Sequence, residues 1–88
     1  MSFSHNAWVQ LKGLTAGALM SALEEDGWQL DTTKGSIHTY IKFTSKGNRR
    51  VQVHFHGKNK GWGRALVKKM LSEIAWSEGD LKRLRLIK

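Results

Sequence analysis

Residues 35–55, GSIHTYIKFTSKGNRRVQVHF, contain two stretches that alternate like β-strands on either side of a turn. The first stretch, residues 37–43, is rich in β-branched and aromatic residues, which favour strands. Its alternation predicts one core face and one open, wet face. The expected core face comprises Ile37, Thr39, Ile41 and Phe43, and the expected open face comprises His38, Tyr40 and Lys42. Residues 45–48 predict a turn. Residues 50–55 then return antiparallel, with Val51, Val53 and Phe55 alternating with Gln52 and His54.

Helical patterns flank this hairpin. A helix is expected over residues 15–26, with Thr15 as its N-cap and Gly27 as its C′ residue. Its buried stripe is Ala16, Leu19, Met20 and Leu23. A second helix is expected over residues 64–75, with the stripe Val67, Met70, Leu71 and Ile74. Residues 28–33 form a short additional strand. Residues 77–80 begin a terminal helix, where Trp76 and Leu81 are spaced as a hydrophobic staple around the Ser77 cap.

The resulting order is α-β-β-β-α with a short C-terminal helix. It predicts an α+β fold in which helices cover one face of a three-stranded antiparallel sheet, as in double-stranded-RNA-binding domains. The 88 residues suffice for a single domain, 1–88, in which residues 1–13 are expected to be an N-terminal arm. The chain has no cysteine, no pattern typical of a signal peptide and no long apolar run, so we expect a cytoplasmic protein that is not held in a membrane.

Positive charge is concentrated in the second part of the chain. The formal net charge is +8, yet residues 1–33 carry −3 and residues 34–88 carry +11. Between Lys34 and Lys69 there are ten Lys and Arg residues and no Asp or Glu. A field of one sign attracts polyanions, because each neutralised phosphate releases condensed counterions. The pattern therefore favours nucleic acid as a partner. A basic surface that only improves solubility is the alternative, and membrane headgroups are a weaker one.

Four segments in this order resemble the HicA family, the small toxins of type II toxin–antitoxin pairs. They are ALEEDGW (22–28), TTKGSIHTYIKF (32–43), RRVQVHFHGK (49–58) and GDLKRLRLIK (79–88). The resemblance covers residues 14–88, and its specificity lies in the order of the segments. It implies a metal-independent endoribonuclease that needs no cofactor and cleaves mRNA. It also implies a HicB-like antitoxin partner that covers the active site.

The family's hallmark is Gly-Ser-His at the start of the second strand, with that histidine catalytic. Here the sequence is Gly35-Ser36-Ile37-His38, so Ile37 stands at the catalytic position. Adjacent strand residues point to opposite faces, which makes this a real departure. Three interpretations follow. His38 takes over the role through a bulge near Gly35, the protein binds RNA without cleaving it, or the chain is an altered version of the family.

Cleavage of RNA without a metal needs a base for the 2′-OH proton, an acid for the leaving 5′-oxygen and cations for the phosphorane. Histidine has an unperturbed pKa of about 6.5 and serves as either acid or base. We predict His38 as the catalytic residue, against the alternative of an ordinary surface histidine. The basic residues expected to contact phosphates are Arg49, Arg50, Lys58, Lys60, Arg64, Lys68 and Lys69. The expected RNA-binding surface also includes Lys34, Gly35, Ser36, Tyr40, Lys42 and His56.

Three further features have alternative interpretations. His54 and His56 are two residues apart and are expected to share a face with His38, so a three-imidazole metal site is a minor alternative to no metal site. Residues 57–63, GKNKGWG, form a glycine-rich loop that is not a Walker A motif but leads into a helix whose free N–H groups suit a phosphate. Trp62 in this loop either stacks on an unpaired base or attaches the loop to the core.

Two functions of different classes therefore stand after the sequence. One is an RNA-cleaving toxin, and the other is a non-catalytic RNA-binding or regulatory module on the same fold. Ile37 favours the second. A DNA-binding domain is weaker than either, because no helix-turn-helix pair with a recognition helix is visible.

Overall fold

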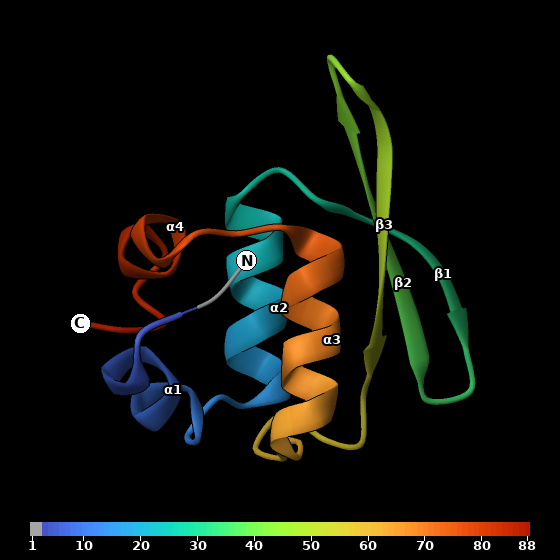
Figure 1. Cartoon of the computed structure of the whole chain (residues 1–88). Helices are drawn as coiled ribbons and strands as arrows, with labels where there is room; N and C mark the ends of the chain where they lie inside the picture. Colours follow the sequence, from blue (N-terminus) through green and yellow to red (C-terminus); the bar gives the residue numbers. More distant parts are fainter. Residues whose placement is uncertain (1–2) are drawn as a thin grey trace.

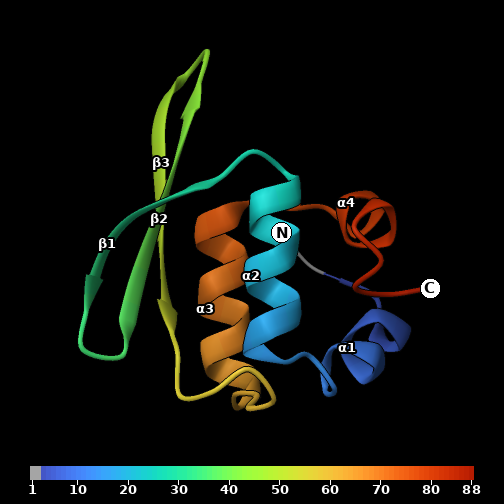
Figure 2. The same cartoon turned by 180° about the vertical axis from the view of Figure 1, so that it is seen from behind.

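A computed structural model describes residues 3–88 (Figure 1). The sheet forms one layer, and the parallel helices α2 and α3 cover one of its faces (Figures 1 and 2). Two short helices, α1 and α4, lie on the far side of this helical layer. The elements are α1 (His5–Leu11), α2 (Ala16–Glu25), β1 (Gln29–Lys34), β2 (Ile37–Thr44), β3 (Gly47–His54), α3 (Arg64–Ile74) and α4 (Glu78–Arg83). The expected α+β fold is confirmed.

The helix ends follow the predicted local chemistry. The Thr15 hydroxyl accepts from the Ala18 N–H at 3.3 Å at the start of α2, and Gly27 after its end has φ +93°. Ser77 and Asp80 form a reciprocal capping box on α4, and the stapling residues Trp76 and Leu81 are both buried. The whole predicted stripe of α3 is buried: Val67, Met70, Leu71 and Ile74. The stripe of α2 comprises Ala16, Leu19, Ala22 and Leu23, with Met20 only half-buried beside them.

The sheet has the order β1-β2-β3 and is antiparallel throughout. Thr44 pairs with Gly47, so the hairpin turns on two residues, and β3 begins three residues earlier than expected. This register places Tyr40 opposite the buried Val51. Directly paired residues of neighbouring strands share a face, so Tyr40 lies on the face that the helices cover. Its side chain is 1% exposed. Burial raises the pKa of its hydroxyl, and the negative charge of Glu24 raises it further.

The predicted faces of β2 are therefore wrong, because they are exchanged. His38, Tyr40 and Lys42 point toward the helices, as their partners Val53, Val51 and Arg49 do. The residues expected in the core, Ile37, Thr39, Ile41 and Phe43, form the face that no helix covers. Phe43 is 68% exposed near the hairpin tip.

The expected N-terminal arm is also wrong over most of its length, because residues 5–11 form α1. The Ser4 hydroxyl caps this helix by accepting from the Ala7 N–H at 3.3 Å, and Ala7 and Leu11 are buried. Contacts with the other end of the chain hold α1 in place. The Ser4 N–H donates to the Glu78 carboxylate, and the Lys88 N–H donates to the Gln10 side chain at 2.7 Å. Residues 1 and 2 of the expected arm lie outside the described residues.

One carboxylate joins α2, the sheet and α4. Asp26, at the end of α2, accepts from the indole N–H groups of Trp28 and Trp76 at 3.2 and 2.8 Å. It also forms ion pairs with Lys42 at 3.1 Å and Arg83 at 2.8 Å. Burial would raise the pKa of this carboxyl, but these donors outweigh it and hold the pKa at about 2. These five residues are called the Asp26 corner below.

Within residues 3–88, no helix is both long and apolar enough to cross a membrane.

Candidate nucleic-acid interface

The uncovered face of the sheet carries polar and basic side chains in rows that run across the strands. At one end, Lys34 of β1 and His54 of β3 are the direct partners of Ile37. The next rows are Thr32–Thr39–Gln52 and Gln29–Ile41–Arg50. Because partners share a face, the central apolar strand is flanked by amides, hydroxyls, an imidazole and two cations. This surface is called the open face below.

His54 supplies the imidazole of the open face. It is half-buried at the last position of β3, directly opposite Ile37. The exposed Lys34 lies on the other side of Ile37 in the same row. Sequence reasoning noted His54 but assigned it to the wrong neighbours, because it expected His38 on the same face.

His38 lies on the opposite face of the sheet, toward the helices. Its ring is half-buried, and its centroid is 4.9 Å from that of Phe55. Its Nδ1 atom is buried and has no hydrogen-bond partner within residues 3–88. A buried polar atom without a partner is costly, so this imidazole is not held as an ordinary structural histidine would be. The register thus separates His38 from His54, and the premise of the three-imidazole metal site is wrong. No three His, Asp or Glu side chains of the described chain gather into a metal-binding group.

The predicted RNA-contact residues fall into two sets. Tyr40 and Lys42 face the helices, Tyr40 buried and Lys42 paired with Asp26, so neither is on the predicted open surface. Arg49 is exposed but donates to the Glu73 carbonyl of α3 at 3.1 Å. The exposed remainder of the basic set comprises Lys34, Arg50, Lys58, Lys60, Arg64, Lys68 and Lys69, with His56 exposed beside them. Gly35 turns the chain between β1 and β2 with φ +59°, and the half-buried Ser36 accepts from the Phe55 N–H at 2.7 Å through its carbonyl.

The loop between β3 and α3 is fastened to the start of α2. The carbonyls of Lys58 and Lys60 accept from the N–H groups of Gly17 and Ala16 at 3.0 and 2.8 Å. The loop thereby satisfies helix N–H groups that would otherwise need water or an anion. A β-carbon on Gly61 would lie 2.8 Å from the Leu14 carbonyl oxygen, so this close approach requires glycine. The loop is therefore more firmly placed than its composition suggests, while the Lys58 and Lys60 side chains remain exposed.

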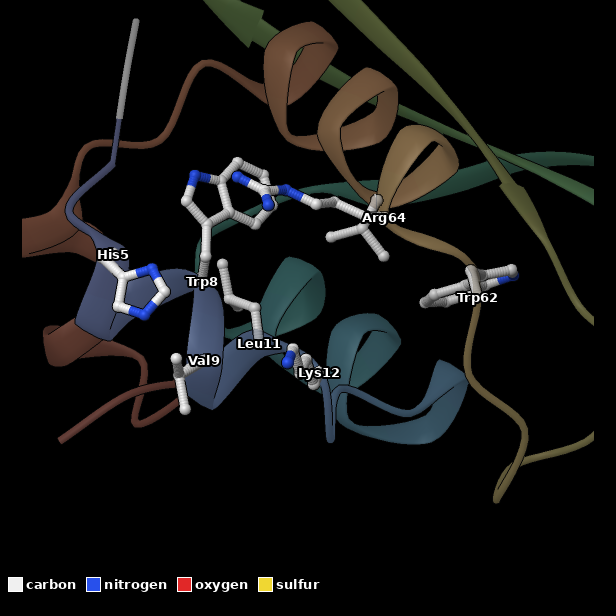
Figure 3. Close-up of a pocket in the computed structure, with 8 residues that line it drawn as sticks. His5, Trp8, Val9, Leu11, Lys12, Trp62 and Arg64 are labelled. Carbon is white, nitrogen blue, oxygen red and sulfur yellow. The ribbon is translucent and has the colours of Figure 1, made fainter.

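Trp62 attaches this loop to the sheet. Its indole N–H donates to the carbonyl of His54 at 2.7 Å, and its half-buried ring packs against the core. The same ring also lines a cleft between α1 and the start of α3 (Figure 3). Both interpretations from the sequence thus retain a structural basis, since the ring holds the loop and keeps a partly free surface.

The cleft beside Trp62 is built largely from α1. Its side chains include Trp8 and Leu11 of α1, Lys12 directly after that helix, and Arg64 of α3. The Arg64 guanidinium lies over the Trp8 ring, 4.8 Å from its centroid (Figure 3). Sequence reasoning missed this cleft because it treated residues 1–13 as an arm. The spacing of Ala7, Trp8 and Leu11 after the capping residue Ser4 is the signal that would have found the helix.

The family model described as the HicA toxin of bacterial toxin–antitoxin systems matches residues 18–76, about two thirds of the chain. No curated protein and no solved structure matches the chain.

Proposed function

Because the chain belongs to the HicA toxin family, and is thus a toxin of the toxin–antitoxin type, we propose that it is an endoribonuclease that cleaves mRNA. The observation that carries this proposal is the open face, where His54, Lys34 and Arg50 flank an uncovered strand. Cations on a face without helices suit a phosphate backbone, and an imidazole among them suits proton transfer.

In the proposed reaction an imidazole removes the proton of a ribose 2′-OH. The resulting oxygen attacks the adjacent phosphorus, and the bond to the 5′-oxygen of the next nucleotide breaks. An acid returns a proton to that leaving oxygen. The nearby cations stabilise the negative charge that develops on the phosphorane. The reaction uses no metal and no organic cofactor.

Two histidines are candidates for the proton transfer. His54 is the better placed, because it shares the open face with Lys34 and Arg50. His38 lies two residues after Ser36 in the chain and remains the second candidate. Its buried Nδ1 atom has no hydrogen-bond partner within residues 3–88. The side chain at the family's catalytic position, Ile37, lies beside His54 on the open face. An imidazole on the neighbouring strand therefore reaches the region that a histidine at position 37 would serve.

The proposal is tested by incubating the purified protein with RNA in EDTA, beside His54→Ala, His38→Ala and the control Lys82→Gln, an exposed residue of α4. We expect His54→Ala to lower the cleavage rate by about 10²–10⁴-fold, which is typical for a lost general acid–base group. RNA affinity should stay within a few-fold, and Lys82→Gln should match the wild type. A loss confined to His38→Ala would move the catalytic site to the second histidine.

A non-catalytic RNA-binding module is the second candidate function, favoured by Ile37 at the catalytic position and by the inward orientation of His38. It replaces the first if the wild-type protein binds RNA but cuts none, either in EDTA or with added divalent metals.

We further propose that the partner is a HicB-like antitoxin that binds the open face. The exposed Phe43 and the half-buried Ile37 and Ile41 offer an apolar ridge on this face, with Lys34 and Arg50 beside it. A partner with an apolar centre and an acidic rim complements both features. Such a partner would exclude RNA simply by occupying the same surface.

A further inference from the structure

The four tryptophans of the chain divide into two pairs with different surroundings. Trp28 and Trp76 are each 3% exposed and donate to Asp26. Trp8 and Trp62 are only half-buried and line the same cleft between α1 and the start of α3 (Figure 3). The parts of the Trp8 and Trp62 rings that the core leaves uncovered are accessible to a ligand.

The cleft combines aromatic walls with positive charge. Lys12 and Arg64 contribute the cations, and His5 lies at its α1 end. Among residues 3–88, none of those that line the cleft is acidic. No ion pair within residues 3–88 engages Lys12 or Arg64. A positive cleft with aromatic rings suits a ligand that is both planar and anionic.

The size of the cleft limits the ligand further. It holds about 180 Å³, less than the roughly 300–1,000 Å³ of sites that enclose a whole drug-sized molecule. One planar ring fits this space better than an extended ligand does. The walls are also fixed before a ligand arrives, because Trp62 is held by its bond to the His54 carbonyl at 2.7 Å. On the opposite wall, α1 is held by its buried residues Ala7 and Leu11.

We propose that this cleft binds one unpaired nucleotide of single-stranded RNA, with the base against Trp62 and the stacked Trp8–Arg64 pair, and its phosphate near Lys12. Aromatic side chains commonly hold unpaired bases by stacking, and lysine and arginine neutralise the attached phosphates. The inference rests on the RNA-binding function proposed above and extends it to a second subsite. The two sites are separate: the open face is the side of the sheet away from the helices, and the cleft lies between α1 and the start of α3. Trp62 in the cleft donates to the backbone carbonyl of His54. Much of this subsite comes from α1, which lies outside the family match at residues 18–76.

The test measures binding of a fluorescein-labelled ten-nucleotide oligoadenylate RNA by anisotropy, and quenching of tryptophan fluorescence by adenosine 5′-monophosphate. We expect Trp8→Leu to weaken oligoadenylate binding by about 5- to 150-fold, the range found when a stacking ring is removed. Trp8→Phe should retain most of the affinity, because it keeps an aromatic ring. This conservative variant also guards against a loss of structure in Trp8→Leu, whose fold is checked by circular dichroism.

A charge variant tests the phosphate contact separately. Lys12→Gln should reduce the slope of log affinity against log salt by about 0.7, the value for one contact to a single strand. Lys82→Gln removes an equally exposed lysine on α4, away from the cleft, and should leave the slope unchanged. If the wild type binds oligoadenylate but Trp8→Leu and Lys12→Gln bind it equally well, the subsite is wrong and the open face alone binds RNA. If the wild type binds no RNA at all, the proposed function fails together with the subsite.

Discussion

The two ends of the helical layer contain the same types of side chain, but these differ in burial and in whether the cations are paired. The Asp26 corner, at one end of α2, brings together two tryptophans, a lysine and an arginine around one carboxylate. The cleft at the other end, beside α1, also has two tryptophans, a lysine and an arginine, but no carboxylate. In the corner each of the four donor side chains reaches Asp26, and both tryptophans are buried. In the cleft the rings are half-buried, and neither cation has an acidic partner in the described chain.

The difference shows that residue type alone does not distinguish a structural cluster from a binding surface. A cation that is paired within the chain has already exchanged its water for a carboxylate, and it offers little to a ligand. A cation without such a partner keeps its charge available to a phosphate. Between Lys34 and Lys69 the one Lys or Arg that forms an ion pair within residues 3–88 is Lys42, which binds Asp26. The remaining cations of this stretch therefore form the field that the composition predicts.

The largest change in stability is expected from breaking the corner with Asp26→Asn. The amide keeps the shape but loses the charge that Lys42 and Arg83 face. Hydrogen bonds to charged groups contribute about 1.5–3 kcal/mol each, although both cations are partly exposed and recover some hydration. We expect the free energy of unfolding to fall by about 2–3 kcal/mol, measured by urea denaturation.

Glu25→Gln is the matched control for that variant. Its carboxylate is half exposed, and within residues 3–88 its one ion pair is with the exposed Arg85, at 3.5 Å. Exposed pairs contribute little, so its loss should change stability by less than about 1 kcal/mol. Equal effects of the two variants would show that the corner is no more important than a surface ion pair.

The fold followed from the sequence where the signals are local. Caps, helix stripes and the hairpin turn depend on neighbouring residues, and Thr15, Gly27 and Ser77 were recognised by that chemistry. The face of β2 depends instead on its register with β3. Period-two patterning is compatible with either face of β2 as the core face, and it favours the more apolar one. A two-residue turn from Thr44 to Gly47 sets Tyr40 opposite Val51, and counting back from this turn would have reversed the choice.

The site was harder to predict, because its geometry depends on distant contacts. Helix α1 has seven residues, too short to be stable alone, and it is held by groups at the other end of the chain such as Glu78. No pattern near Trp8 reveals those contacts. The sequence predicts the excess of positive charge in this stretch as a sum of its residues. It does not show that Lys42 is neutralised, because this depends on an ion pair with Asp26, sixteen residues earlier in the chain.

Acid should lower the free energy of unfolding, as Asp26→Asn does, by a slightly smaller amount. The pKa of Asp26 is about 2 in the folded chain, against an ordinary value of 3.8. Between these values the unfolded chain binds more protons than the folded one, so this carboxylate's contribution is complete above about pH 4 and is lost as pH falls toward 2. The loss should approach about 2 kcal/mol.

The measurement is the difference in unfolding free energy between the wild type and Asp26→Asn at several pH values from 2 to 6. Other carboxyls also titrate here, since the Ser77 N–H lowers the pKa of Asp80 and the Ser4 N–H lowers that of Glu78. Both chains share those groups, so the difference isolates Asp26. A difference that stays constant from pH 6 down to pH 2 would rule out the ionised carboxylate as the source of the corner's stability.

The smallest expected effect compares one lysine from each end, through Lys42→Gln and Lys60→Gln. Lys42 is paired with Asp26, so its loss should cost about 1 kcal/mol of stability and leave the salt dependence of RNA binding unchanged. Lys60 is exposed, and its hydrogen bonds within residues 3–88 use its backbone: its carbonyl accepts from the Ala16 N–H, and its N–H donates to the Gly57 carbonyl. Its side chain is thus free for phosphate, and Lys60→Gln should leave stability within about 0.5 kcal/mol. If Lys60 contacts one phosphate of a single strand, the salt slope should fall in magnitude by about 0.7.

Anisotropy titrations from low to moderate salt give the slope, and urea denaturation gives the stability. A reduced slope for Lys42→Gln would mean that this lysine leaves Asp26 to bind RNA, and the contrast between paired and unpaired cations would then fail.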